Sequence, residues 1–79
     1  MKHKKEYYVC KQMINDPNIT EGQIAFVEKK LKYLLETEES AHVNILCGKL
    51  SLIKNDIETA KYYFSKEEIY QVHIMDYLK

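Results

Sequence analysis

The sequence predicts an all-α fold of four to five short antiparallel helices, arranged as one small domain over residues 1–79. Two observations lead to this prediction. Apolar residues recur three and four positions apart along most of the chain, which is the spacing that lines one face of a helix. Only two glycines and one proline interrupt the sequence, and its 46% hydrophobic and 30% charged residues are typical of a globular chain rather than a disordered one.

A first helix is predicted from about Lys4 to Ile14. Tyr7, Cys10 and Ile14 fall at positions i, i+3 and i+7, which line one side of a helix, and Val9 and Met13 lie alongside them. The segment 15–18 should end this helix, because the residue before Pro17 is disfavoured in the helical conformation and because asparagine and aspartate prefer turns.

A second helix is predicted to begin directly after Thr20. Thr20 and Gln23 have the spacing of a capping box, and Ile19 and Ile24 have that of a hydrophobic staple. An inward-facing apolar stripe follows at helical spacing: Ile24, Val27, Leu31, Leu34 and Leu35.

A third helix is predicted from Ala41 to about Lys54, after the acidic connection 36–40, with Ser40 as its N-cap. Its inner face comprises Val43, Leu46, Cys47, Leu50 and Ile53. Ile45 and Leu52 lie outside that face, so this helix is expected to make a second apolar contact.

A fourth helix is predicted to start after Asp56, a natural N-cap, and to turn Ile57, Ala60 and Phe64 toward the third helix. A break is expected near Ser65, where Ser65 and Glu68 fit a second capping box. The alternative is a helix that continues unbroken, because residues 61–78 contain neither glycine nor proline.

Three of these residues resemble a known repeat. Gly48, Ala60 and Phe64 are similar to the pattern of the tetratricopeptide repeat, which places small residues where its two helices touch and an aromatic residue beneath them. The resemblance covers Ala41 to about Val72. A weaker match to the same pattern lies one repeat earlier, in Gly22, Val27 and Leu31. The stretch NDIETAKYYF also resembles the helical repeats of Gram-positive peptide-receptor regulators.

The chain departs from the repeat at four positions. Asn44 stands where tryptophan is common, Cys47 where leucine is, Ser51 where tyrosine is, and Val72 where the closing proline would fall. The resemblance implies a concave groove and an incomplete array, because about three repeats are needed for a solenoid, and self-association would complete it. The alternative is an unrelated helical protein that places a glycine and an alanine at helix contacts.

Charge and apolar patterning exclude several classes of partner. The net charge is zero and the chain contains no arginine, so no nucleic-acid partner is expected. The lysines at positions 2, 4 and 5 are interpreted as a solvated tail, and contact with an anionic surface is the alternative. No apolar run is long enough to span a membrane or to form a signal peptide, so the predicted location is the cytoplasm. Cys10 and Cys47 are accordingly expected to be reduced and buried.

No recognisable catalytic or metal-binding motif is present. His3, His42 and His73 are not spaced as metal ligands with one another or with the cysteines, and there is neither a nucleophile in a catalytic context nor a glycine-rich phosphate loop. The prediction is therefore no enzyme, no metal and no cofactor. A small enzyme or metal-dependent switch built on His42 or His73 is the least favoured alternative.

Tyrosine is the residue type in excess, with seven in 79 residues. Because tyrosine combines apolar area with a polar hydroxyl, it favours interfaces. The predicted partner-binding strip is Tyr63, Tyr70, Ile74 and Tyr77, although these rings could instead form the rim of the core. The expected function is a small regulator or inhibitor that binds a protein or peptide and forms a homo-oligomer. The alternative is a structural homodimer without a separate ligand.

Overall fold

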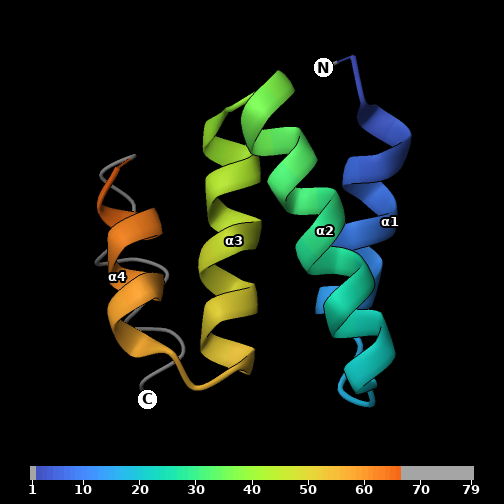
Figure 1. Ribbon diagram of the computed structural model, residues 1–79, viewed down its shortest axis with the longest axis vertical. Coiled ribbons are helices and arrows are strands. Elements are labelled where there is room, and N and C mark those ends of the chain that lie inside the picture. The colour runs from blue at the N-terminus through green and yellow to red at the C-terminus, as the bar shows by residue number, and fades with distance from the viewer. Residues whose placement is uncertain (1, 67–79) are drawn as a thin grey trace.

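The computed structural model describes residues 2–66 and confirms the all-α prediction. These residues form four helices and no strand: α1 (Lys4–Ile14), α2 (Glu21–Thr37), α3 (Ala41–Ile53) and α4 (Ile57–Ser65). α3 packs against all three other helices, and α1 also packs against α2. In Figure 1 the chain reverses direction at each connection, and α3 lies between α2 and α4.

α1 has the predicted bounds and is tied to the end of α2. The backbone N–H groups of Lys2 and His3 donate hydrogen bonds to the Glu38 carboxylate, over 2.5 Å and 3.0 Å. Glu38 directly follows α2, so its carboxylate joins the start of α1 to the C-terminal end of α2. Lys4 and Lys5 belong to the first turn of α1, so the interpretation of these lysines as a tail was wrong, although both stay exposed.

The predicted start of α2 is confirmed in both halves of its capping box. The Gln23 N–H donates to Thr20 Oγ1 over 3.1 Å, and the Thr20 N–H donates to Gln23 Oε1 over 3.0 Å. These bonds satisfy backbone donors that have no partner within the helix. The main core cluster then combines buried residues of the first three helices: Cys10, Ile14, Val27, Leu31, Leu34, Val43, Leu46, Cys47 and Leu50.

The turn between α3 and α4 is fixed by two backbone hydrogen bonds and one left-handed residue. Asn55 has a φ of 62°, a conformation that asparagine adopts more readily than most residues. The Asn55 N–H bonds to the Leu52 carbonyl and the Asp56 N–H bonds to the Ser51 carbonyl, which is the Schellman pattern of a helix end. Asp56 is at the same time the N-cap of α4, as predicted.

α4 docks on α3 through a second, smaller apolar cluster. Ala60 and Phe64 are fully buried and pack with Ile45 and Leu52, the two residues predicted to give α3 a second contact. α4 ends at Ser65, near which the sequence places a break. The sequence predicted small residues where the third and fourth helices touch, and this is confirmed at Gly48, where a Cβ would lie 2.6 Å from Cε1 and Cζ of Phe64.

We predict that Gly48→Ala lowers the free energy of unfolding by about 1–3 kcal/mol, because the added methyl group would overlap the buried Phe64 ring. The matched control is Gly22→Ala at an exposed position of α2, where the nearest atom to a new Cβ is 3.9 Å away. That change should stabilise the protein by up to about 1 kcal/mol through helix propensity. Urea unfolding followed by circular dichroism compares the two, and equal effects would contradict the close α3–α4 contact.

Candidate functional site

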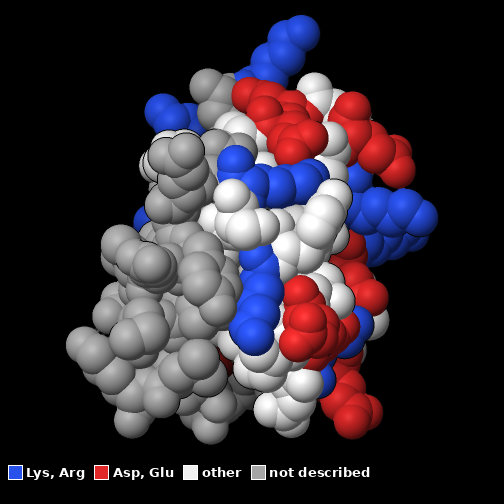
Figure 2. All heavy atoms as spheres, turned by 90° about the vertical axis from the view of Figure 1, so that its left-hand side faces the viewer, with Lys and Arg blue, Asp and Glu red and all other residues white. Residues whose placement is uncertain are grey.

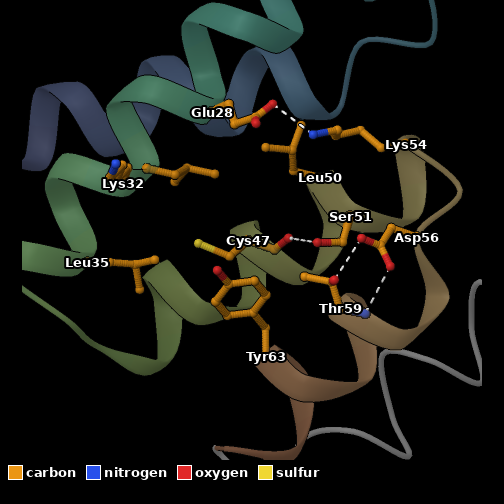
Figure 3. A pocket seen from close by; sticks show the side chains of 11 residues that line it. Glu28, Lys32, Leu35, Cys47, Leu50, Ser51, Lys54, Asp56, Thr59 and Tyr63 are labelled. Atoms are coloured by element: carbon orange, nitrogen blue, oxygen red, sulfur yellow. Dashed lines mark hydrogen bonds and ion pairs between the residues drawn. The ribbon is translucent and has the colours of Figure 1, made fainter.

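An open cleft lies between α2, α3 and α4, on the side of α3 that faces both neighbours (Figure 3). Its volume is about 360 Å³. We call it the α2–α3–α4 cleft. Its lining comprises Glu28, Leu31, Lys32, Leu35, Cys47, Leu50, Ser51, Lys54, Asp56, Thr59 and Tyr63.

The floor of the cleft is apolar. Leu31, Cys47 and Leu50 are buried core residues whose edges reach the surface here, and Leu35 is half-buried beside them. Tyr63 comes from α4, is half-buried, and in Figure 3 points its phenol into the cleft on the side of Cys47. The floor thus offers aliphatic, thiol and aromatic surface from three helices.

Two fixed polar groups border this floor. Lys54 Nζ lies 2.9 Å from Glu28 Oε1, which links the end of α3 to the middle of α2. Asp56 accepts hydrogen bonds from the N–H of Thr59 at 3.1 Å and from its hydroxyl at 2.7 Å. Lys32 adds an exposed ammonium group to the same border. The charges at the border balance, with Lys32 and Lys54 opposite Glu28 and Asp56.

The environment changes the acidity of three groups at the cleft. Burial raises the pKa of the Cys47 thiol to about 12. Burial also raises the pKa of the Tyr63 phenol, with the neighbouring Cys47 as a smaller cause. The hydrogen bonds from Thr59 lower the pKa of Asp56, because they stabilise its carboxylate form. At neutral pH the floor is therefore uncharged, whereas Asp56 is ionised.

A polar cluster beyond the cleft holds the end of α4 in place. Glu39 Oε2 accepts hydrogen bonds from Asn44 Nδ2 and from Lys66 Nζ, each over 3.2 Å, and so connects the start of α3 to the end of α4. These bonds lower the pKa of Glu39. The Lys66 ammonium also lies 4.8 Å from the centre of the Tyr62 ring. Asn44 is fully buried, so this polar contact uses a side chain from the interior of the protein.

The charges on the α4 side of the molecule are mixed. Figure 2 views this side, and its described part carries acidic and basic side chains next to one another rather than a field of one sign. The described part of this side therefore contributes little to long-range steering of a strongly charged partner.

The structure places one residue of the predicted partner-binding strip in the cleft. Tyr63 lines it, whereas Tyr70, Ile74 and Tyr77 lie outside the described residues. Sequence reasoning missed the ion pair between Glu28 and Lys54, which are 26 residues apart and gave no local signal. It assigned Cys47 and Leu50 to the core correctly, but not to the floor of a cleft.

The cysteines and histidines are placed as follows. Cys10 and Cys47 are buried free thiols, as predicted. The rings of His3 and Tyr33 form a T-shaped pair with centres 5.2 Å apart, and those of His42 and Tyr7 form another with centres 6.0 Å apart. Within residues 2–66, no three histidine, cysteine, aspartate or glutamate side chains gather as a metal site would require. None of the helices in this part combines the length and apolar character needed to cross a membrane.

Comparison with known proteins adds no relative: no protein-family model matches the chain, and neither a curated protein nor a solved structure is similar enough to count as a match.

The raised thiol pKa predicts slow alkylation of Cys47. With a pKa of about 12, roughly one thiol in ten thousand is a reactive thiolate at pH 8, against about a quarter for an ordinary cysteine. Iodoacetamide should therefore label Cys47 about a thousandfold more slowly in native buffer than in urea, as followed by mass spectrometry of its proteolytic peptide. Tyr63→Ala should accelerate labelling of Cys47 but not of Cys10. Equal native and denatured rates would show that the floor is not desolvated.

The lowered carboxyl pKa predicts how acid affects stability through Asp56. Its pKa in the folded protein lies below the unfolded value of about 3.9, so the contribution is present above pH 4 and is lost as the pH falls through the folded pKa. Asp56→Asn keeps an N-cap of similar quality but has no charge. Urea midpoints between pH 6 and 2.5 should fall less steeply for Asp56→Asn than for the wild type. Parallel pH profiles would contradict this assignment.

Proposed function

We propose that this chain is a non-catalytic interaction module that binds an apolar segment of a partner protein or peptide in the α2–α3–α4 cleft. The observation that carries the proposal is the apolar floor shared by three helices, open to solvent in a small protein that is otherwise rich in charge. Concave sites that combine apolar surface with polar groups at defined positions are the usual form of binding sites.

Binding would draw its affinity from the floor and its orientation from the border. An apolar side chain seated on Leu35, Leu50 and the Tyr63 ring would remove both surfaces from water, which contributes about 25 cal/mol per Å² of apolar area. The Glu28–Lys54 ion pair and Lys32 would then fix the direction of the bound segment through hydrogen bonds.

The proposal also includes the role, location and repeat kinship that the sequence predicts. A small module of this kind suits a regulator or inhibitor that covers a surface of its partner, working in the cytoplasm. Kinship with tetratricopeptide repeats remains part of the proposal; the close contact of Gly48 with Phe64 is expected from this kinship and equally from an unrelated helical protein. Tyr70, Ile74 and Tyr77 stay predicted as an extension of the binding face.

A structural homodimer is the second candidate. It is favoured by the large aromatic side chains that the described residues leave exposed, namely Tyr8, Phe26, Tyr33 and Tyr62. Tyr62 is the most exposed of them at 57%. A permanent self-interface would cover such rings and add the buried area that a short chain lacks.

We predict that Tyr63→Ala weakens capture of a cleft-binding peptide about tenfold or more, whereas Tyr62→Ala changes it less than twofold. The two tyrosines are neighbours on α4, but only Tyr63 lines the cleft. A peptide library displayed on phage would be selected on the wild-type protein, and the dissociation constants of chosen peptides would be measured by calorimetry for all three proteins.

Light scattering over a wide concentration range accompanies this test. A monomer whose selected peptides bind the wild type and Tyr62→Ala but not Tyr63→Ala supports the cleft. Peptides that bind Tyr63→Ala as well as the wild type place the binding face elsewhere. A constant dimer that selects no peptide, and that Tyr62→Ala dissociates, supports the structural homodimer instead.

A further inference from the structure

A second groove lies between α1 and α3 and shares no lining residue with the α2–α3–α4 cleft. We call it the α1–α3 groove; its volume is about 310 Å³. Four of its lining residues come from α1 and one comes from the start of α3: Lys4, Tyr7, Tyr8, Lys11 and His42.

The α1 residues of this groove form one stripe along the helix. Lys4, Tyr7, Tyr8 and Lys11 stand at positions i, i+3, i+4 and i+7, so they project to one side of α1. With a rise of 1.5 Å per residue, the two lysines are separated by about 10 Å along the helix axis. Two basic groups thus flank a pair of tyrosines.

The aromatic rings that lie between the two lysines pack against one another. The Tyr7 ring contacts Tyr8 and His42 edge to face, with centres 5.4 Å and 6.0 Å apart. Tyr7 also packs against the main core, whereas Tyr8 is 49% exposed. Lys11 Nζ lies 6.0 Å from the centre of the Tyr8 ring. Tyr7 thereby fixes the position of an aromatic platform that remains open to solvent.

The charge of this groove is of one sign. No aspartate or glutamate lines it. No described carboxylate lies within 4 Å of the ammonium group of Lys4 or Lys11. Three other lysines do have carboxylate partners at that distance, namely Lys54, Lys61 and Lys66. In a chain of zero net charge, this concentration of basic groups on one side of α1 differs from the balanced border of the cleft.

We propose that the α1–α3 groove binds an acidic peptide segment of a partner protein, with carboxylates on Lys4 and Lys11 and an apolar side chain on Tyr8. A polyproline II segment has three residues per turn and advances about 3.1 Å per residue, so carboxylates three residues apart lie on one side of it and about 9 Å apart, which matches the separation of the lysines. The tyrosine platform lets the partner bury apolar area between the two charge contacts. This surface is additional to the proposed cleft and does not depend on it.

The test uses fluorescence anisotropy with a defined probe. The probe is a fluorescein-labelled twelve-residue peptide that carries glutamates three residues apart on both sides of a leucine, and the control peptide has glutamine at those positions. Binding to the acidic peptide should weaken with added salt, because these exposed charges are screened. The glutamine peptide should bind at least tenfold more weakly than the acidic one.

Charge-reversal variants of the full chain locate the site. We expect Lys4→Glu and Lys11→Glu each to weaken binding of the acidic peptide about tenfold, since each replaces an attraction by a repulsion at the groove. The matched control is Lys29→Glu, an exposed residue of α2 that lines neither the groove nor the cleft, and it should change binding less than twofold. Lys4→Glu should not weaken the helix, because a carboxylate is favourable in a first turn.

Tyr8→Ala tests the aromatic part of the groove. This change should weaken binding of the acidic peptide several-fold and leave the salt dependence of binding unchanged, because it removes apolar surface and no charge. Circular dichroism of each variant confirms that the helices are retained.

Several results would overturn the proposal. If Lys29→Glu weakened binding of the acidic peptide as much as Lys11→Glu, the peptide would be attracted to lysines in general rather than bound at one site. A loss caused by Tyr63→Ala instead would place the peptide in the cleft. Equal binding of the glutamine peptide would remove the role of the carboxylates. Tighter binding of a single-stranded oligonucleotide of the same charge would assign the groove to phosphates.

Discussion

The contact between Gly48 and the ring of Phe64 is the constraint on which the position of α4, and with it the α2–α3–α4 cleft, depends. A Cβ at position 48 would lie 2.6 Å from the ring, so only glycine lets Phe64 reach the backbone of α3. Because Phe64 and Ala60 are fully buried at this crossing, α4 comes to lie close to α3. That approach places Tyr63, the residue directly before Phe64, at the floor of the α2–α3–α4 cleft.

α3 can accept this contact because it is apolar on more than one side. One face contributes Val43, Leu46 and Leu50 to the main core, while Ile45 and Leu52 meet α4 in the second cluster. A helix with apolar residues around much of its circumference must be covered on several sides. α3 is therefore the central helix in Figure 1, and both surfaces proposed for binding are built against it.

The two surfaces differ in the physics that would select their partners. The cleft has balanced charges at its border, uncharged groups on its floor and a shape that only the packing of three helices creates. Its selectivity would come from apolar shape. The α1–α3 groove carries basic groups beside an exposed ring, so its selectivity would come from charge and would decline with salt. Together they would let one small chain hold two different segments.

The sequence by itself determined the helices, because their signals are local. The capping box at Thr20, the cap at Asp56 and the main apolar stripes each depend on residues a few positions apart, and they are found as predicted. Gly48 and Ala60 could also be assigned to a helix contact from their size. Tertiary structure alone decided that Lys54 meets Glu28 and that His42 joins Lys4 and Lys11, because these pairings connect separate helices. Periodicity shows which side of a helix is apolar, but the relative rotation of packed helices decides which side chains line a common surface.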